Sequence, residues 1–186
     1  MKNFFKRIGW KLQAMKSIRN NRKNLLQVYK AVATIPRCLE ARGKITVRQN
    51  TRLFLGENII LFPNIVFWGG GEIILGNEVQ IGDNTMIFSS MKSGVSIGDK
   101  TLIAANCYII DCDHQIDKNS EIICQGIISS PVNIGKGCWI GANVTILRGA
   151  IIHDGAVIGA GAVVKGEIPA NAIAVGVPAK VVKYRE

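Results

Sequence analysis

An aliphatic residue returns at every sixth position over much of this chain. From residue 75 the hexads read LGNEVQ, IGDNTM and IFSSMK, then, after a slip of four residues, IGDKTL, IAANCY and IIDCDH. The rhythm resumes at residue 134 with IGKGCW, IGANVT, ILRGAI, IHDGAV, IGAGAV and VKGEIP. An amphipathic helix needs apolar residues at intervals of three and four, whereas short extended segments with a turn every six residues match this period. The repeat therefore predicts an all-β fold of short stacked strands.

Three such segments in each turn of the chain form a triangular prism, in which every coil buries its inner face against its neighbours. We expect the lead residue and the fifth residue of each hexad to point inward. A β-sandwich would instead place its turns at irregular intervals of roughly 8–12 residues. Weaker alternation begins near residue 45, so we assign residues 45–186 to the prism. Residues 1–44 are assigned to a basic, amphipathic helical segment.

The stretch IGKGCWIGANVTILRGAIIHDGAVIGAGAVVKGEIPANAIAVGVPAKVV resembles the hexapeptide-repeat acetyltransferases. It is similar to the galactoside, maltose and polysaccharide O-acetyltransferases, and the resemblance covers roughly residues 75–183. It implies a left-handed parallel β-helix, a hand that the usual right-handed crossover rule would not predict. It also implies a homotrimer that uses acetyl-CoA and a saccharide acceptor, such as a surface polysaccharide or a lipid-linked saccharide.

The hexads stop after His114, and residues 115–131, QIDKNSEIICQGIISSP, are predicted to leave the prism wall as a loop. Loops on rigid scaffolds commonly carry function. An isolated histidine is most simply a polar turn residue, but the resemblance implies a catalytic histidine just before the extended loop. Neutral imidazole can take the proton of a hydroxyl as it attacks a thioester, and can then protonate the leaving thiolate.

The group that orients the His114 ring is left open by the sequence, because Asp111, Asp113 and a backbone carbonyl all qualify. The developing charge on the thioester oxygen needs a fixed donor. The resemblance implies a backbone N–H from the coil after the loop, which maps to Gly141 or Ala142. We expect direct attack in a ternary complex, since no cysteine occupies a position that the family uses for an acyl-enzyme.

The resemblance further implies an acetyl-CoA groove between subunits, with small residues beside the pantetheine arm and cations beside the phosphates. The residues predicted to line it are Trp139, Gly141, Ala142, Gly159, Ala160, Lys165, Lys180 and Lys183. The hexad turns demand small residues in any case, and surface lysines are usually only solvated.

Asn84 matches by spacing an asparagine that contacts the acceptor in the galactoside enzymes, and Trp139 matches a tryptophan often found near the active site. Asn84 fits an ordinary IGDN turn equally well, and Trp139 fits a packing residue at a subunit interface. His153 is expected to be an exposed turn residue. The alternative functions are serine or amino-sugar N-acetyl transfer, or a non-catalytic β-helix scaffold or interaction protein.

The β-helical carbonic anhydrases need three zinc-binding histidines, whereas this chain has two histidines in total, so we expect no metal.

The basic residues are concentrated at the N-terminal end. Residues 1–52 hold fourteen Lys and Arg residues and one acidic residue, Glu40, whereas the rest of the chain holds nine Lys and Arg residues and twelve acidic residues. Residues 1–32 can therefore cap the prism or lie on an anionic membrane. Nucleic acid is not expected, because no recognition motif accompanies the charge. Unpaired cysteines favour a cytoplasmic location, with possible peripheral contact at the inner face of the membrane.

Overall fold

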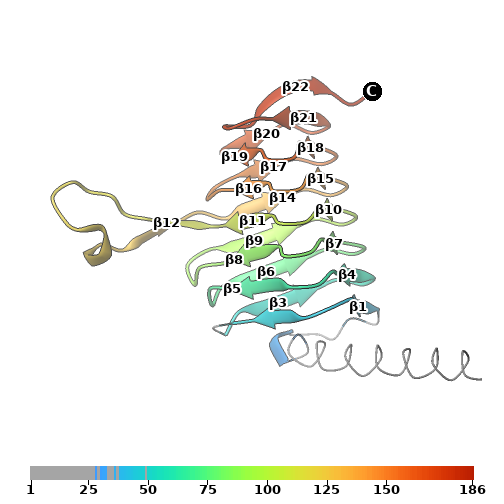
Figure 1. Ribbon diagram of the computed structural model, residues 1–186, viewed down its shortest axis with the longest axis horizontal. Coiled ribbons are helices and arrows are strands. Elements are labelled where there is room, and N and C mark those ends of the chain that lie inside the picture. Colours follow the sequence, from blue (N-terminus) through green and yellow to red (C-terminus); the bar gives the residue numbers. More distant parts are fainter. Residues whose placement is uncertain (1–27, 29, 33–35, 37, 49) are drawn as a thin grey trace, which may run out of the picture.

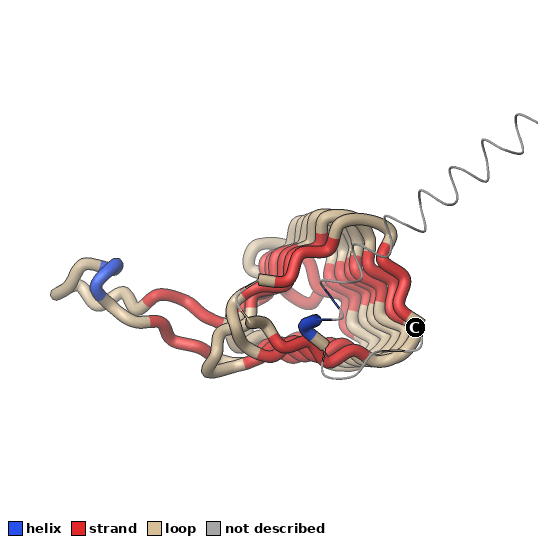
Figure 2. The backbone as a smooth tube through the Cα atoms, turned by 90° about the horizontal axis from the view of Figure 1, so that it is seen from below, coloured by secondary structure: helices blue, strands red, loops and turns tan. Residues whose placement is uncertain are grey.

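The chain winds upward as a stack of coils with a triangular outline (Figures 1 and 2). The computed structural model describes residues 28, 30–32, 36, 38–48 and 50–186. These residues form about seven turns, which confirms the prediction of a left-handed parallel β-helix. The amphipathic helix expected at the N-terminal end falls mostly on residues 1–27, outside the described residues. In the described residues, no helix is both long and apolar enough to cross a membrane.

Each face of the prism is one sheet, and successive strands of a coil belong to successive sheets. The first sheet contains β1 (Leu39–Ala41), β4 (Ile59–Leu61), β7 (Gln80–Ile81), β10 (Leu102–Ile103), β15 (Trp139–Ile140), β18 (Val157–Ile158), β21 (Ala172–Val175) and β22 (Lys180–Tyr184). The second sheet contains β2 (Ile45–Val47), β5 (Ile65–Trp68), β8 (Met86–Phe88), β11 (Tyr108–Ile110), β16 (Thr145–Ile146) and β19 (Val163–Val164). The third sheet contains β3 (Arg52–Leu55), β6 (Glu72–Leu75), β9 (Gly94–Ile97), β14 (Val132–Ile134), β17 (Ile151–Ile152) and β20 (Glu167–Ile168).

Pairing within the three sheets is parallel, apart from β22, which folds back antiparallel on β21. The first coil already begins at β1, ahead of the boundary that we placed at residue 45.

We call the corner between the first and second sheets the first–second edge, and the corner between the second and third sheets the second–third edge. These two edges bound the second sheet.

The core is a ladder of aliphatic side chains along the prism axis. Every lead residue of the hexads is buried: Leu75, Ile81, Ile87, Ile97, Ile103, Ile109, Ile134, Ile140, Ile146, Ile152, Ile158 and Val164. The fifth residues are buried too, with two exceptions that flank the irregular corners, Met91 and Asp113. Side chains alternate between the two sides of a strand, so a strict repeat keeps the same rows inside along the whole stack.

The wall of the described coils is interrupted between β11 and β14. There the chain leaves the wall as an antiparallel hairpin of β12 (Cys112–His114) and β13 (Ile127–Ser129), with the short 3-10 helix η1 (Ile122–Cys124) near its tip. Figures 1 and 2 show this hairpin projecting away from the prism. The hairpin occupies the segment where the hexads predicted a loop, and its paired part begins at Cys112.

The two isoleucines of β17 test this description. Ile152 is 1% exposed and Ile151 is 38% exposed. We expect Ile152→Ala to lower the free energy of unfolding by about 2–5 kcal/mol, because it removes buried methyl groups and leaves a cavity. Ile151→Ala removes the same atoms from the outer face, and should cost less than about 1 kcal/mol. Chemical denaturation of both variants measures the difference, and equal losses would contradict the assigned register.

Candidate functional site

Asp111 lies at the second–third edge, where the hairpin begins, and its side chain is fully buried. Its Oδ1 accepts the Ser90 backbone N–H at 2.8 Å, and its Oδ2 lies 3.3 Å from the Ser90 hydroxyl. Ser90 belongs to the same edge one coil below. Burial raises the pKa of Asp111, and the two bonds from Ser90 lower it only in part. The carboxylate therefore ties the root of the hairpin to the coil below.

Asp113 is tied in the opposite direction along the prism. The Arg148 Nε donates to its Oδ2 at 2.8 Å, and Arg148 follows β16 on the same edge one coil above. We expected the fifth position of this hexad to point inward, but the Asp113 side chain is exposed. The alternation of buried and exposed positions in the hexads does not continue to the fifth residue after Ile109. The buried carboxylate is that of Asp111, and not that of Asp113.

His114 is the last residue of β12, opposite Ile127 of β13, and its side chain is exposed. Its ring makes no hydrogen bond or ion pair with any residue that the structure describes. Asp111 bonds Ser90, and Asp113 bonds Arg148. Which group orients the ring therefore stays a prediction.

The small residues predicted to line the groove meet at the first–second edge. Gly141 and Ala142 follow β15, and Gly159 and Ala160 follow β18 in the coil above. A Cβ atom on Gly141 would lie 2.6 Å from the Ala160 backbone nitrogen, so the stacking of coils itself requires glycine there. Packing thus explains Gly141 fully, and its contact with a cofactor remains a prediction.

Only one of the two predicted oxyanion donors has an N–H that is available in the single chain. The Gly141 N–H donates to the Ile158 carbonyl at 2.8 Å. Among the described residues, the Ala142 N–H has no such acceptor. An unused backbone donor on a rigid corner is the kind of group that can stabilise a developing negative charge.

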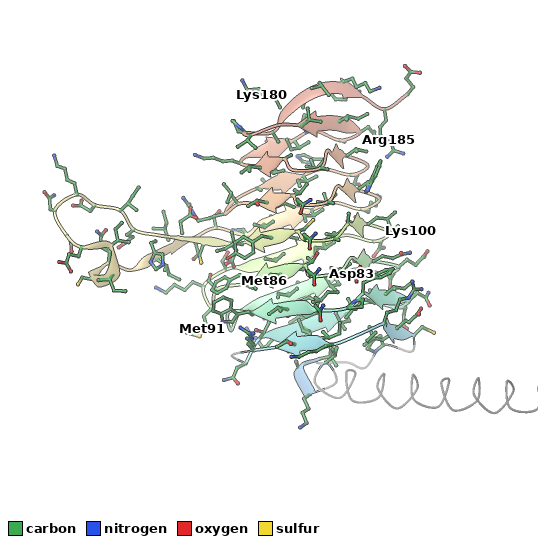
Figure 3. All side chains as sticks on the ribbon, in the orientation of Figure 1. Asp83, Met86, Met91, Lys100, Lys180 and Arg185 are labelled. Carbon is green, nitrogen blue, oxygen red and sulfur yellow. The ribbon has the colours of Figure 1, made fainter. Side chains whose placement is uncertain are left out.

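The remaining predicted cofactor residues divide between the two edges. Trp139 begins β15 on the first sheet and is 57% exposed. Lys180 and Lys183 lie on β22, the last strand of the same sheet, and Figure 3 shows Lys180 at the C-terminal end of the stack. Lys165 instead follows β19 and stands on the second–third edge, where it is exposed.

Asn84 turns the chain at the first–second edge with a φ of 57°, in the left-handed region that asparagine tolerates. Its Oδ1 accepts the Asn64 amide at 3.1 Å, and its Nδ2 donates to Asn106 Oδ1 at 3.2 Å. In Figure 3 the preceding residue, Asp83, lies on the side of the prism away from the hairpin. A shallow groove beside this corner is lined by Phe62, Gln80, Gly82, Asp83, Leu102, Ile103, Ala104 and Trp139.

The candidate residues thus form two groups that one chain holds apart. His114 and Lys165 lie on the second–third edge, whereas Trp139, Ala142 and the other small residues lie on or beside the first–second edge. Sequence reasoning missed Ser90 and Arg148, which hold the two aspartates. No motif marks either residue, and Arg148 is 35 positions from its partner.

Cys112 is the thiol nearest to His114 in sequence, and it is 6% exposed. Burial raises the pKa of its thiol, and the charges of Asp111 and Asp113 raise it further. A thiolate is therefore disfavoured at this position, and Cys112 lacks the activation of a nucleophile. In the part of the chain that is described, no three His, Cys, Asp or Glu side chains gather closely enough to hold a metal ion.

The described coils form a β-helix of hexads that one projecting hairpin interrupts. Two family models match the chain, "Bacterial transferase hexapeptide (six repeats)" at residues 131–166 and "Hexapeptide repeat of succinyl-transferase" at residues 72–110. WbbJ of Escherichia coli, named "Putative lipopolysaccharide biosynthesis O-acetyl transferase", is 37% identical over 78% of this chain and 79% of its own length. The chain therefore belongs to the hexapeptide-repeat acetyltransferases, a family of acyltransferases.

Other relatives match over a smaller share of their length. A probable acetyltransferase of Mycobacterium tuberculosis is 47% identical over 62% of this chain, which spans 38% of that protein. The galactoside O-acetyltransferase of Escherichia coli is 36% identical over 69% of this chain, which spans 62% of that protein. AntD, an N-acyltransferase from Bacillus cereus solved with dTDP and 3-hydroxybutyryl-CoA, shares the fold with a TM-score of 0.72 at 17% identity, over 86% of each chain.

The buried carboxylate of Asp111 predicts a dependence of stability on pH. Its pKa in the folded protein is raised above the ordinary 3.8, so its ionisation costs stability above the raised pKa, and this cost disappears as the pH falls below 3.8. Asp111→Asn keeps an acceptor for the Ser90 N–H without the charge. At pH 7 it should be at least as stable as the wild type, and the difference should shrink toward low pH.

Asp111→Ala is the matched variant, because it removes the acceptor together with the charge. It should lose about 1–3 kcal/mol, since the buried Ser90 N–H is left without a partner. Denaturation of the three proteins between pH 4 and pH 7 measures both effects. If Asp111→Asn lowered the free energy of unfolding at pH 7 as much as Asp111→Ala does, this account of the Asp111 contacts would be contradicted.

Proposed function

We propose that the protein is an acetyl-CoA-dependent O-acetyltransferase that acts on a saccharide hydroxyl, with His114 as the general base. The observation that carries the proposal is the position of His114. It is the exposed imidazole at the root of the one hairpin that interrupts the described coils. The relatives named O-acetyltransferases support an oxygen acceptor, and the name of WbbJ supports a saccharide of surface-polysaccharide assembly.

The catalytic site is completed by a neighbouring copy in a homotrimer. His114 and the small-residue corner lie on opposite edges of the second sheet. Three copies that turn this sheet toward a common axis place the second–third edge of one chain beside the first–second edge of the next. Each of the three clefts then contains His114 from one chain and Ala142 from its neighbour.

The outer face of the second sheet supports this orientation. None of its outward side chains from β5 to β19 is charged: Val66, Trp68, Met86, Phe88, Tyr108, Ile110, Thr145 and Val163. Trp68 and Phe88 meet edge to face, with centroids 5.1 Å apart. An apolar, aromatic surface of this kind is typical of a permanent interface. The third sheet also exposes Phe54, Ile74 and Ile151, but it carries an outward ion pair, Arg52 with Glu72.

The chemistry is direct transfer between two bound substrates. His114 takes the proton of the acceptor hydroxyl as its oxygen attacks the thioester carbon, and then returns that proton to the departing CoA thiolate. The Ala142 N–H donates to the thioester oxygen as negative charge develops on it. The raised thiol pKa of Cys112 supports a mechanism without an acyl-enzyme.

Acetyl-CoA is assigned to the first–second edge. Gly159 and Ala160 let the pantetheine arm approach the backbone. Lys180 and Lys183 on β22 would form ion pairs with the phosphates of acetyl-CoA. Lys165, on the other edge, would reach the arm from the neighbouring chain. The groove beside Asn84 and Trp139 offers an aromatic wall with polar groups around it, which suits a sugar ring.

Removal of the imidazole tests the general base. His114→Ala should lower kcat by about 10²–10⁴-fold, the usual contribution of a positioned base. The exposed side chain makes no hydrogen bond or ion pair with the described residues, so the melting temperature should not change. Turnover is measured as CoA release with a panel of free and lipid-linked saccharides as acceptors, and His153→Ala is the matched histidine control.

Calorimetry with acetyl-CoA separates this proposal from a non-catalytic scaffold. His114→Ala should bind acetyl-CoA as tightly as the wild type, because the arm and the phosphates lie on the other edge. Near-normal turnover by His114→Ala would overturn the assignment of the base. A folded wild-type protein that does not bind acetyl-CoA would favour the scaffold.

Mixing of two inactive variants tests whether neighbouring chains share the site. Ala160 is exposed at the first–second edge, so Ala160→Trp should block the groove without disturbing the core. His114→Ala and Ala160→Trp should each be inactive. When the two variants are co-refolded in equal amounts, about one quarter of wild-type activity should return. About one cleft in four then combines His114 from an Ala160→Trp chain with the intact groove of a His114→Ala chain.

The recovered activity distinguishes a shared site from a site within one chain. If His114 and Ala160 of the same chain served one site, every site in the mixture would carry one lesion and no activity would return. Sedimentation of the mixture must give the trimer mass, and two separately refolded samples that are combined afterwards provide the control.

A further inference from the structure

The strand that carries His114 is held at its root by residues from two other coils. From below, the Ser90 backbone N–H donates to the buried Asp111 carboxylate at 2.8 Å. From above, the Arg148 guanidinium donates to Asp113 at 2.8 Å. Ser90, Arg148 and the hairpin root all stand on the second–third edge. The hairpin is therefore fixed on both sides before it leaves the prism.

Beyond this root, the described contacts of the hairpin are internal to it. The Gln115 N–H donates to the Gly126 carbonyl at 2.9 Å, and the Gln125 side chain bonds Asp117 and Ser120 across the tip. These bonds shape the ribbon, but they do not fix its direction relative to the prism. The direction of the ribbon is set by the contacts of Asp111 and Asp113, together with the Gly149 N–H, which donates to the Ser130 carbonyl at 3.2 Å where the second strand of the hairpin meets the wall.

The ion pair and the imidazole lie on opposite sides of the ribbon. Asp113 and His114 are consecutive residues of β12, and consecutive side chains of a strand point to opposite sides. When Arg148 holds Asp113 against the coil above, His114 is turned to the other side of the ribbon. Rotation or twisting of the ribbon would move the ring together with its strand.

We infer that Arg148 is a positioning residue for His114, which it orients by pinning Asp113 and not by any contact with the ring. The inference rests on the proposed role of His114 as the base. Arg148 suits this task because its planar guanidinium gives directed hydrogen bonds to a carboxylate, which a lysine ammonium does not.

The exposure of the pair separates positioning from stabilisation. The side chains of Arg148 and Asp113 are 32% and 48% exposed, and partly exposed ion pairs contribute little to global stability. Catalysis is far more sensitive, because a displacement of about 1 Å can lower a rate by roughly 10²-fold. Loss of the pair should therefore lower kcat and leave the fold intact.

The first test is kinetic. Arg148→Ala should lower kcat by roughly 10–100-fold, with little change in the KM for acetyl-CoA, because the groove lies on the other edge. Arg148→Lys should recover only part of the loss. The double variant Asp113→Arg/Arg148→Asp, which restores an ion pair with the charges exchanged, should have a higher kcat than either Asp113→Arg or Arg148→Asp alone. Arg52→Ala is the matched control, since Arg52 pairs with Glu72 at 2.9 Å on the third sheet, away from the hairpin.

The second test measures the direction of the hairpin without any activity. Cys124 lies in η1 near the tip and Cys38 lies just before β1, and both are exposed, whereas Cys107, Cys112 and Cys138 are buried. Spin labels on Cys38 and Cys124 therefore report the distance from the hairpin to the prism. Labelled chains are diluted with unlabelled Cys38→Ser/Cys124→Ser chains, so that each trimer carries one labelled copy. The distance distribution should be narrow in the wild type and broad in Arg148→Ala.

The combined outcomes keep the two proposals separate. A broadened distribution together with a lowered kcat and an unchanged melting temperature supports the inference. An unchanged kcat in Arg148→Ala overturns it, whatever the distance distribution shows. A fall in kcat with an equally narrow distribution also overturns it, because Arg148 would then act by another route. Full turnover by His114→Ala would overturn the proposed base itself.

Discussion

The stacking of hexads in register is the constraint on which the rest of this molecule depends. Each coil satisfies its backbone hydrogen bonds with the coils above and below, and its inward rows complete a core that no single coil could form. Corners must therefore turn within a few residues, and a Cβ at Gly141 would meet the backbone of the next coil. Such a wall has little room for chemistry, so catalytic groups belong at its edges or where the chain leaves it.

This rigidity also explains why the candidate residues are divided. The second sheet separates the corner of Ala142 from the corner of His114, and parallel β-pairing prevents the prism from bending the two together. In the proposed homotrimer, the half-site at each edge of one chain is completed by a neighbouring copy. Closed cyclic assembly would supply this without any new sequence, because every chain offers both edges.

The sequence predicted those features that the period of six controls. The buried rows, the parallel coil and the position of the break follow from side chains that recur at fixed intervals. Beyond the last regular hexad before the hairpin, the repeat no longer predicts which side chains are buried. Asp113 was expected inside by counting from Ile109, yet the chain turns outward there and Asp111 is the buried carboxylate. Its pairing with Ser90, and that of Asp113 with Arg148, joins different coils, and no local pattern reports such contacts.

The position of His114 along the hairpin has a mechanical reason. A ribbon that is fixed at its root moves most at its tip, since displacement grows with distance from the pivot. With a rise of about 3.3 Å per residue, a pivot of roughly 10° would move a group one residue beyond the clamp by about 0.6 Å, and a group eight residues beyond it by about 5 Å. His114 directly follows Asp113, so it is the first side chain past the clamp. Ile122 and Ile123, which are exposed near the tip, would move much farther than His114 in such a pivot.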